Sequence, residues 1–177
     1  MAGEAGRPER MLAAALEKEE QGRNFYREAA EKCSVAPGKE LFSTLVIEEE
    51  IHIKRIRQIS ESLQAGNPWT EDWKALKGTN ENLRNLMQDR IRLLGPEARA
   101  AKGDLDVVEI GIQMEQGSIL FYEDELKKAS DPLEIEFIKK MIAEEHTHFA
   151  SLEDLKLFLT DPKSWYIEKE KPSLDGA

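Results

Sequence analysis

Two pairs of residues with the spacing Glu-x-x-His are the part of this sequence most suited to chemistry. Glu145 precedes His148 in the stretch IAEEHTHFASLEDL, and Glu49 precedes His52 in VIEEEIHIKRIRQI. Residues three apart on a helix share one face, so each pair can direct a carboxylate and an imidazole into the same interior space. Burying both groups is costly unless a charged species lies between them. The spacing therefore predicts a metal ion.

The two pairs belong to an internal repeat with an offset of 96 residues, from 49 to 145 and from 52 to 148. At the same offset, LEKEEQGRNFYREAAEK aligns with IQMEQGSILFYEDELKK without a gap. Glu19 then falls on Glu115, and Tyr26 falls on Tyr122, whereas most other positions differ. The identities are concentrated where chemistry would take place, which indicates two equivalent halves around one site.

Composition and periodicity indicate which elements must position these residues. Glycine and proline are sparse, with 11 and 7 among 177 residues, and 34% of the chain is charged, as is typical of a helical domain. Apolar residues at spacings of three and four predict an all-α fold, an antiparallel four-helix bundle. A long crossover lets the third helix begin at the same end of the bundle as the second, and one such crossover is typical of ferritin-like bundles.

The predicted boundaries divide a single domain, 1–177, into four parts. They are two helices within 8–66, the crossover 67–103 with an additional short helix at about 80–94, two helices within 104–160, and a tail over 161–177. Within them, we expect the first helix to end near Ser34 and the third to end near Ala129. Trp69 and Trp73 are expected to pack against the bundle, and Trp165 to anchor the tail.

In this bundle two helices contribute one glutamate each and two contribute a Glu-x-x-His pair each. That is the ligand set of ferritin-like di-iron and di-manganese bundles. By analogy with such sites, Glu49 and Glu145 would bridge two metals, while each remaining residue would bind one. Four carboxylates balance the charge of two divalent ions. Iron or manganese suits these ligands best, although zinc or cobalt could occupy the same site. The predicted ligands are Glu19, Glu49, His52, Glu115, Glu145 and His148.

Four neighbouring residues could each act in more than one way. Tyr26 and Tyr122 follow Glu19 and Glu115 by seven residues, or about two helical turns. They could donate hydrogen bonds to the metal-binding carboxylates or simply pack in the core, and the two roles are compatible. Glu48 and Glu144 precede the bridging glutamates and point roughly 100° away from them. For these two residues we expect a surface position or a contact between helices.

Other features of the sequence exclude some functions. A net charge of −10 argues against binding to nucleic acid or to an anionic membrane surface. The polar N-terminus lacks a signal peptide, and no apolar run approaches the roughly 20 residues that span a bilayer, so a cytoplasmic protein is expected. The single cysteine, Cys33, excludes an internal disulfide, a four-cysteine iron or zinc centre and a CxxC pair.

The segments LEKEEQGRNFY, VIEEEIHIKRI, MEQGSILFYED and IAEEHTHFASLEDL resemble the four helices of the rubrerythrin family, within the ferritin-like superfamily. The resemblance covers most of the chain and implies a di-iron site at the six residues named above. Full-length rubrerythrins also carry a rubredoxin domain, for which this chain lacks the cysteines. A short form of this kind is expected to take electrons from an external donor such as a rubredoxin-like protein. Ser118 stands where some rubrerythrins have a further metal-binding glutamate, so that carboxylate's part in their peroxidase mechanism does not carry over.

These observations favour a non-haem di-iron oxidoreductase that reduces hydrogen peroxide or dioxygen. One alternative is a ferroxidase that handles iron, which would need an assembly with a cavity. Another is a structural bundle in which two metals, for example zinc, only hold the helices together. The duplicated halves also suggest a homodimer, with or without an exchange of halves between the two subunits.

Overall fold

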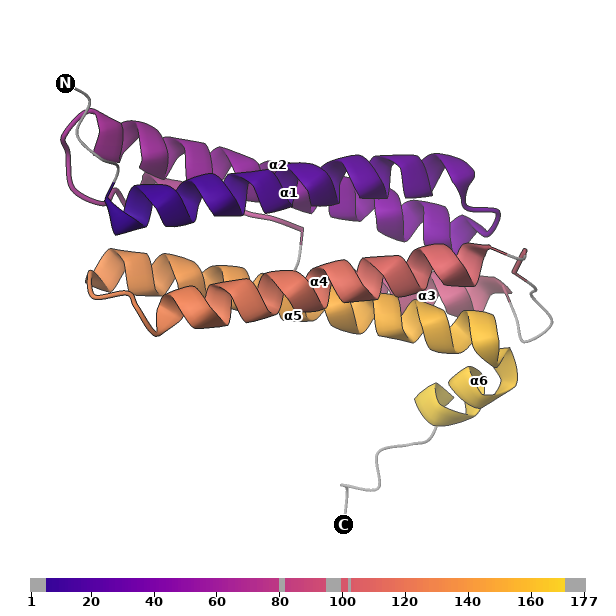
Figure 1. The fold of residues 1–177 in the computed structure, drawn as a ribbon. Coiled ribbons are helices and arrows are strands. Elements are labelled where there is room, and N and C mark those ends of the chain that lie inside the picture. Colours follow the sequence, from indigo (N-terminus) through magenta and orange to yellow (C-terminus); the bar gives the residue numbers. More distant parts are fainter. Residues whose placement is uncertain (1–5, 80–81, 95–99, 102, 171–177) are drawn as a thin grey trace, which may run out of the picture.

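Four long helices, arranged as two hairpins, form the centre of the structure (Figure 1). The computed structural model describes residues 6–79, 82–94, 100–101 and 103–170. Throughout these ranges the chain forms helices and no strand, so the all-α prediction is confirmed. The first hairpin consists of α1 (Arg7–Lys32) and α2 (Ala36–Gln64), and the second consists of α4 (Asp104–Leu126) and α5 (Pro132–Thr160).

The two hairpins lie against each other as the two layers of an antiparallel bundle. In Figure 1, α1 lies beside α4 and in front of α2, while α2 lies beside α5. The connection after α2 runs back along the bundle, so that α4 begins at the same end as α2 (Figure 1). This is the long crossover expected from the sequence, and it makes neighbouring helices antiparallel.

Local sequence explains where the helices begin and end. The Asp131 side chain accepts hydrogen bonds from the backbone N–H groups of Leu133, at 2.8 Å, and Glu134, at 3.3 Å, and so caps α5. Gly66 follows α2 with φ +78°, a conformation that glycine adopts at little cost. Two ends come earlier than predicted: α1 stops at Lys32 and α4 at Leu126. Residues 127–130 instead form the turn that brings Asp131 to its capping position.

Two apolar clusters fill the bundle on either side of its middle. Leu12, Ile56 and Phe137 belong to one, together with Trp69 and Trp73, which pack as predicted. The other cluster lies further toward the α1–α2 turn and includes Leu41, Phe42, Val108, Leu155 and Trp165. The predicted site residues lie between the clusters along all four helices, so apolar packing holds the helices on both sides of the site.

The described parts of the crossover and the tail form three further helices. They are the 3₁₀ helix η1 (Asp72–Ala75), α3 (Leu83–Leu94) and α6 (Pro162–Glu170). The short crossover helix is confirmed, although residues 80 and 81 of the range predicted for it lie outside the described residues. The sequence predicted an anchor in the tail and did not specify its conformation. Trp165 is fully buried, and the Tyr166 hydroxyl donates to the carbonyl of Ile91 at 2.6 Å.

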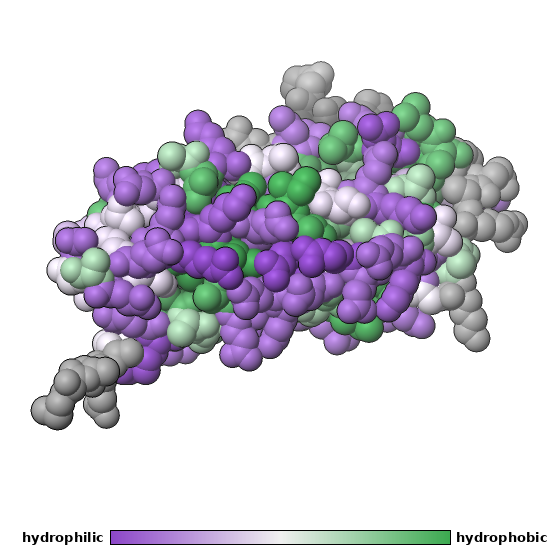
Figure 2. Space-filling model, turned by 90° about the horizontal axis from the view of Figure 1, so that it is seen from above, coloured by the Kyte–Doolittle hydropathy of each residue, from purple (hydrophilic) through white to green (hydrophobic). Residues whose placement is uncertain are grey.

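The outer surface of the first hairpin is mainly hydrophilic. Figure 2 shows this face from above, with hydrophobic groups gathered in smaller patches between charged and polar side chains. Among the described helices, none combines the length and the apolar character needed to cross a bilayer.

Candidate metal centre

The four long helices bring all six predicted ligands together in the middle of the bundle. α1 contributes Glu19 and α4 contributes Glu115, whereas α2 and α5 contribute the two Glu-x-x-His pairs. Each of the six residues is at most 3% exposed. Carboxylates and imidazoles are rarely buried so completely without a charged partner, so the arrangement suits cations bound between them.

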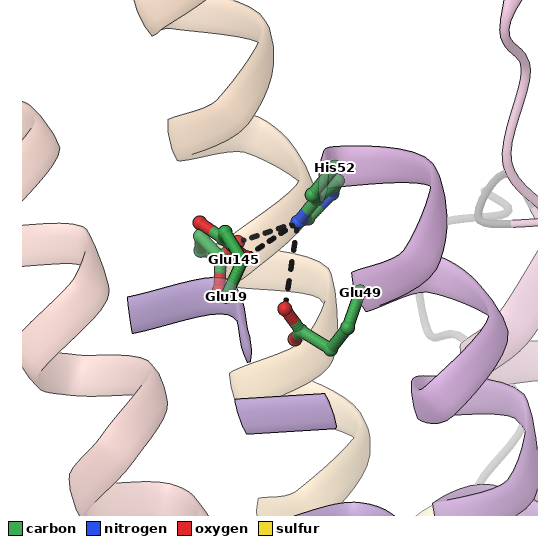
Figure 3. Close-up of side chains that lie close together, drawn as sticks. All are labelled: Glu19, Glu49, His52 and Glu145. Carbon is green, nitrogen blue, oxygen red and sulfur yellow. Dashed lines mark hydrogen bonds and ion pairs between the residues drawn. The ribbon is translucent and has the colours of Figure 1, made fainter. Parts of the chain in front are cut away.

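The first cluster surrounds the Nδ1 atom of His52, as Figure 3 shows. This nitrogen lies 3.1 Å from Glu19 Oε2, 3.1 Å from Glu145 Oε1 and 3.8 Å from Glu49 Oε2. One ligand atom from each of these four residues lies within 4.8 Å of all the others, close enough to surround a single ion.

The second cluster surrounds the Nδ1 atom of His148 in the same manner. It lies 3.6 Å from Glu115 Oε2, 3.8 Å from Glu145 Oε2 and 3.8 Å from Glu49 Oε1. These four residues again offer ligand atoms within 4.8 Å of one another. The two clusters therefore have the same composition. Each residue of one cluster is the repeat counterpart of a residue in the other.

Glu49 and Glu145 belong to both clusters, and each directs one oxygen toward each histidine. A carboxylate in that position can bind one ion through each oxygen. The geometry thus suits a binuclear site in which these two glutamates bridge the ions, which is the arrangement predicted from the sequence.

The two tyrosines donate hydrogen bonds across the hairpins. Tyr26 of α1 donates to Glu115 Oε1 of α4, and Tyr122 of α4 donates to Glu19 Oε1 of α1 at 2.5 Å. Each tyrosine therefore holds the glutamate of the other half rather than the one in its own helix. Burial, followed by the nearby carboxylates, raises the pKa of both phenols well above its usual value, so both remain protonated donors.

The charges of the cluster suit metal ions, which would replace the protons that these buried groups otherwise bind. Burial, followed by Glu145, raises the pKa of Glu115 to about 8, and burial with the neighbouring carboxylates raises that of Glu49 as well. Burial lowers the pKa of His148, but Glu115 and Glu145 outweigh it and raise the pKa to about 10. Without metal, the cluster attracts protons onto groups that are ordinarily unprotonated at neutral pH. Two divalent ions would neutralise the four carboxylates and leave both imidazoles neutral, as ligands must be.

Glu144 and Arg55 are functional neighbours that the sequence did not reveal. Glu144 is only 4% exposed, and its Oε2 lies 3.1 Å from His52 Nε2, the nitrogen that faces away from the cluster. Arg55, at 2% exposed, forms an ion pair with the same carboxylate, and Lys140 lies 3.1 Å from its Oε1. A carboxylate in this position fixes the tautomer of the imidazole and directs its Nδ1 lone pair toward a metal.

Glu48, the repeat counterpart of Glu144, is also buried but has a different partner. Its carboxylate accepts hydrogen bonds from the backbone N–H and hydroxyl of Thr79 in the crossover. Neither glutamate lies at the surface. Glu144 makes the expected contact between helices, whereas Glu48 contacts the crossover rather than another helix. The reason is that Arg55 and the crossover cover these faces of α2 and α5, which periodicity alone could not indicate.

A pocket of about 210 Å³ between α1 and α4 reaches the cluster from the surface. Glu49, Glu115 and Tyr26 lie on its inner wall, and Lys18 lies among the residues that line it. Gly22 keeps the approach to Glu49 open, because a Cβ atom there would lie 3.3 Å from Glu49 Cδ. Ser118, the repeat counterpart of Gly22, also lines the pocket, where the small hydroxymethyl group leaves space.

A bundle of four helices with two overlapping clusters of carboxylates and imidazole at its centre defines a ferritin-like fold whose buried side chains are suited to a binuclear metal site. The rubrerythrin family model matches residues 10–156 of the 177 in the chain. The chain therefore belongs to the rubrerythrin family, which confirms the resemblance seen in its helices. No curated protein and no solved structure matches it.

Proposed function

We propose that this protein is a non-haem di-iron oxidoreductase that reduces hydrogen peroxide, or dioxygen, with electrons from an external donor. The observation that carries the proposal is a pair of clusters sharing Glu49 and Glu145, next to a pocket that reaches Glu49 and Glu115. Two iron ions bound there would supply the two electrons needed to reduce one molecule of hydrogen peroxide.

The protein's own groups are arranged to hold such a pair in place. Each tyrosine binds the Oε1 atom of a glutamate, which leaves Oε2 of Glu19 facing His52 Nδ1 at 3.1 Å and Oε2 of Glu115 facing His148 Nδ1 at 3.6 Å. The carboxylates are thus oriented by neutral donors that add no charge. Such fixed ligands favour a site that stays in place while the charge of its metals changes.

The pocket supports a redox role over a purely structural one. A volume of about 210 Å³ admits a small oxidant, since a water molecule occupies about 30 Å³ in the liquid. A structural zinc bundle would need no route from solvent to the carboxylates. The route lies directly over Glu49, the glutamate shared by both clusters.

The proposal can be tested with anaerobic protein loaded with ferrous iron. Bound metal is counted first, and then one equivalent of hydrogen peroxide or dioxygen is added while the ultraviolet–visible absorption of the ferric form is recorded. We expect two irons per chain and faster oxidation by peroxide than by dioxygen. Glu145→Ala should lose binuclear binding and keep its helical circular dichroism, whereas Glu153→Ala, on the same helix but outside the clusters, should bind two irons.

Three outcomes would contradict the proposal. Iron that binds but is not oxidised would favour a structural site. Reaction with dioxygen alone, with iron accumulating beyond two ions per chain, would favour a ferroxidase. Full occupancy in Glu145→Ala would show that the site is not the one described.

A further inference from the structure

The sulfur-containing side chains of the described residues differ in how far a small oxidant could reach them. Four of these residues are at most 5% exposed, namely Met11, Cys33, Met87 and Met141. Met114 of α4 is instead half-buried, and it lines the pocket of about 210 Å³ between α1 and α4, here called the oxidant pocket. A sulfur atom reacts with peroxide only where the peroxide can reach it. Among these five residues, Met114 is therefore the most open to oxidation.

The residues that follow Met114 leave space beside it. Gly117 and Ser118 come three and four positions later, on the same face of α4, and both line the oxidant pocket. A Cβ atom added at Gly117 would have open space around it, with no contact within 4 Å. Peroxide that approaches Glu49 through this pocket therefore crosses a space that the Met114 side chain borders.

The opposite wall of the oxidant pocket carries hydrogen-bond donors. Lys18 and Gln21 of α1 contribute an ammonium and an amide. Lys18, the repeat counterpart of Met114, forms no ion pair with a described residue, and its Nζ lies 5.5 Å from the centroid of the Phe121 ring. A thioether sulfur is a weak acceptor, whereas a sulfoxide oxygen is polar and accepts hydrogen bonds from such donors. Oxidation of Met114 would thus add an acceptor that faces two donors.

We propose that Met114 is a site of oxidation by hydrogen peroxide, and that its sulfoxide slows the entry of peroxide to the metal centre. In the reaction, the thioether sulfur attacks one oxygen of the peroxide, so that an S–O bond forms and the O–O bond breaks. The proton of the attacked oxygen goes to the departing oxygen, which leaves as water. The sulfur is oxidised by two electrons and the peroxide is reduced by two.

This inference rests on the proposed function, because it makes the modification depend on the supply of electrons. Peroxide that enters while the centre is reduced is consumed there. When electrons run short, peroxide stays in the pocket and reacts with Met114. A hydrogen bond from Lys18 or Gln21 to the sulfoxide then joins α1 to α4 across the mouth of the pocket. The modification is reversible, because methionine sulfoxide reductases restore the thioether.

The first part of the test locates the modification. Iron-loaded protein in its oxidised state is kept in excess hydrogen peroxide without an electron donor, and samples are quenched with catalase, digested and analysed by mass spectrometry. We expect the peptide that contains Met114 to gain one oxygen atom at least about tenfold faster than the peptides of the three buried methionines, which react only when the bundle opens locally. In denaturant, all four should react at similar rates.

The second part measures the effect on the centre. The pretreated protein is reduced chemically under anaerobic conditions, and the rate constant of its oxidation by peroxide is recorded by stopped flow. We expect this rate constant to be about fivefold smaller than before pretreatment, the factor that one hydrogen bond of ordinary strength across the mouth would supply. A methionine sulfoxide reductase should restore it. Met114→Leu should have the same rate constant before and after pretreatment, whereas Met87→Leu, changed in the core outside the pocket, should lose as much as the wild type.

Three results would overturn the inference. They are oxidation of Met114 no faster than that of the buried methionines, an unchanged rate constant after complete oxidation of Met114, and an equal loss in Met114→Leu and the wild type. Failure of the proposed function would appear separately, because untreated reduced protein would then not be oxidised by peroxide. The regulatory role would fall with it, while the mass spectra would still decide whether Met114 is the modified residue.

Discussion

Glu144 shows how a residue beside a ligand can serve the other half of the site. It directly precedes Glu145 in the chain, yet its carboxylate lies 3.1 Å from the imidazole of His52 on the neighbouring hairpin. Burial raises the pKa of Glu144, but His52 and Arg55 outweigh it and hold the pKa well below its usual value. The carboxylate is therefore ionised, and it favours the His52 tautomer that carries its proton on Nε2.

The change Glu144→Gln tests this role. An amide accepts a weaker hydrogen bond from the imidazole and leaves Arg55 without its carboxylate, so His52 is held less firmly. We expect the affinity for metal to fall roughly 10–100-fold. Affinity is measured by competition with a chelator of known strength. The matched control is Glu48→Gln, because the Glu48 carboxylate binds Thr79 and not His52. Equal affinities for wild type and Glu144→Gln would contradict a positioning role.

At the residue scale, the candidate ligands could be predicted because each ligand type occurs at equivalent positions in both halves of the repeat. Helix composition alone does not produce two copies of Glu-x-x-His, each in register with a further glutamate. The crosswise pairing of Tyr26 with Glu115 could not be predicted, because spacing along one helix says nothing about which helix lies opposite. Arg55 was missed for the same reason, although it follows His52 by one turn on the same face.

At the scale of elements, Asp154 joins three helices. From α5 it pairs with Arg84 of α3 at 2.7 Å and with Lys169 of α6 at 3.1 Å, and it accepts a hydrogen bond from Gln88 of α3 at 3.1 Å. Burial raises the pKa of Asp154, but these three partners outweigh it and lower the pKa. Its charge therefore stabilises the packing of α3 and α6 on the bundle.

We expect Asp154→Asn to reduce the free energy of unfolding by about 1–2 kcal/mol at neutral pH. Since the folded pKa lies below the unfolded value of about 3.9, the contribution is present above that pH and is lost as pH falls through the folded pKa. The difference between variant and wild type should therefore shrink in acid. Denaturant unfolding at several pH values measures it, with Glu153→Gln as the control. A constant difference down to low pH would contradict a stabilising role for these ion pairs.

The long helices could be predicted from periodicity, whereas α6 could not. A helix of nine residues has little stability of its own. It forms because Trp165 is buried against Phe158, with ring centroids 6.2 Å apart, and because Tyr166 and Lys169 reach α3 and α5. Those contacts are tertiary, so the sequence of the tail indicated an anchor but not its conformation.

At the scale of the whole molecule, the fold concentrates four carboxylates and two imidazoles in its interior. The apolar clusters on either side prevent the helices from separating to hydrate them. In the metal-free protein, Glu115, with a pKa of about 8, and His148, with a pKa of about 10, therefore keep protons that the unfolded chain releases at lower pH.

Removing the metal should accordingly make stability depend on pH. Both groups have a folded pKa above the unfolded one, so the stability that they contribute is lost as pH rises, from about 4.3 to about 8 for Glu115 and from about 6.5 to about 10 for His148. Both losses are in progress between about pH 6 and about pH 9. We expect the melting temperature of chelator-treated protein to fall by roughly 5 °C or more over that range. The metal-loaded protein should change much less, because its ligands are already deprotonated. Calorimetry of both forms provides the comparison, and a melting temperature of the metal-free form that stays level or increases would contradict this account.

The crosswise tyrosines also bear on how such a chain could arise. Each hairpin supplies one glutamate that belongs to a single cluster, Glu19 or Glu115, together with a Glu-x-x-His pair. The tyrosine of each hairpin donates a hydrogen bond to that glutamate of the other hairpin. A gene encoding one hairpin would have sufficed for the whole centre, because two copies of its product could meet face to face. Duplication and fusion of that gene would then have let the halves diverge outside the ligands. Glu48 and Glu144 are counterparts in the repeat with different partners, Thr79 and Arg55, which is the kind of difference that such a duplication would allow.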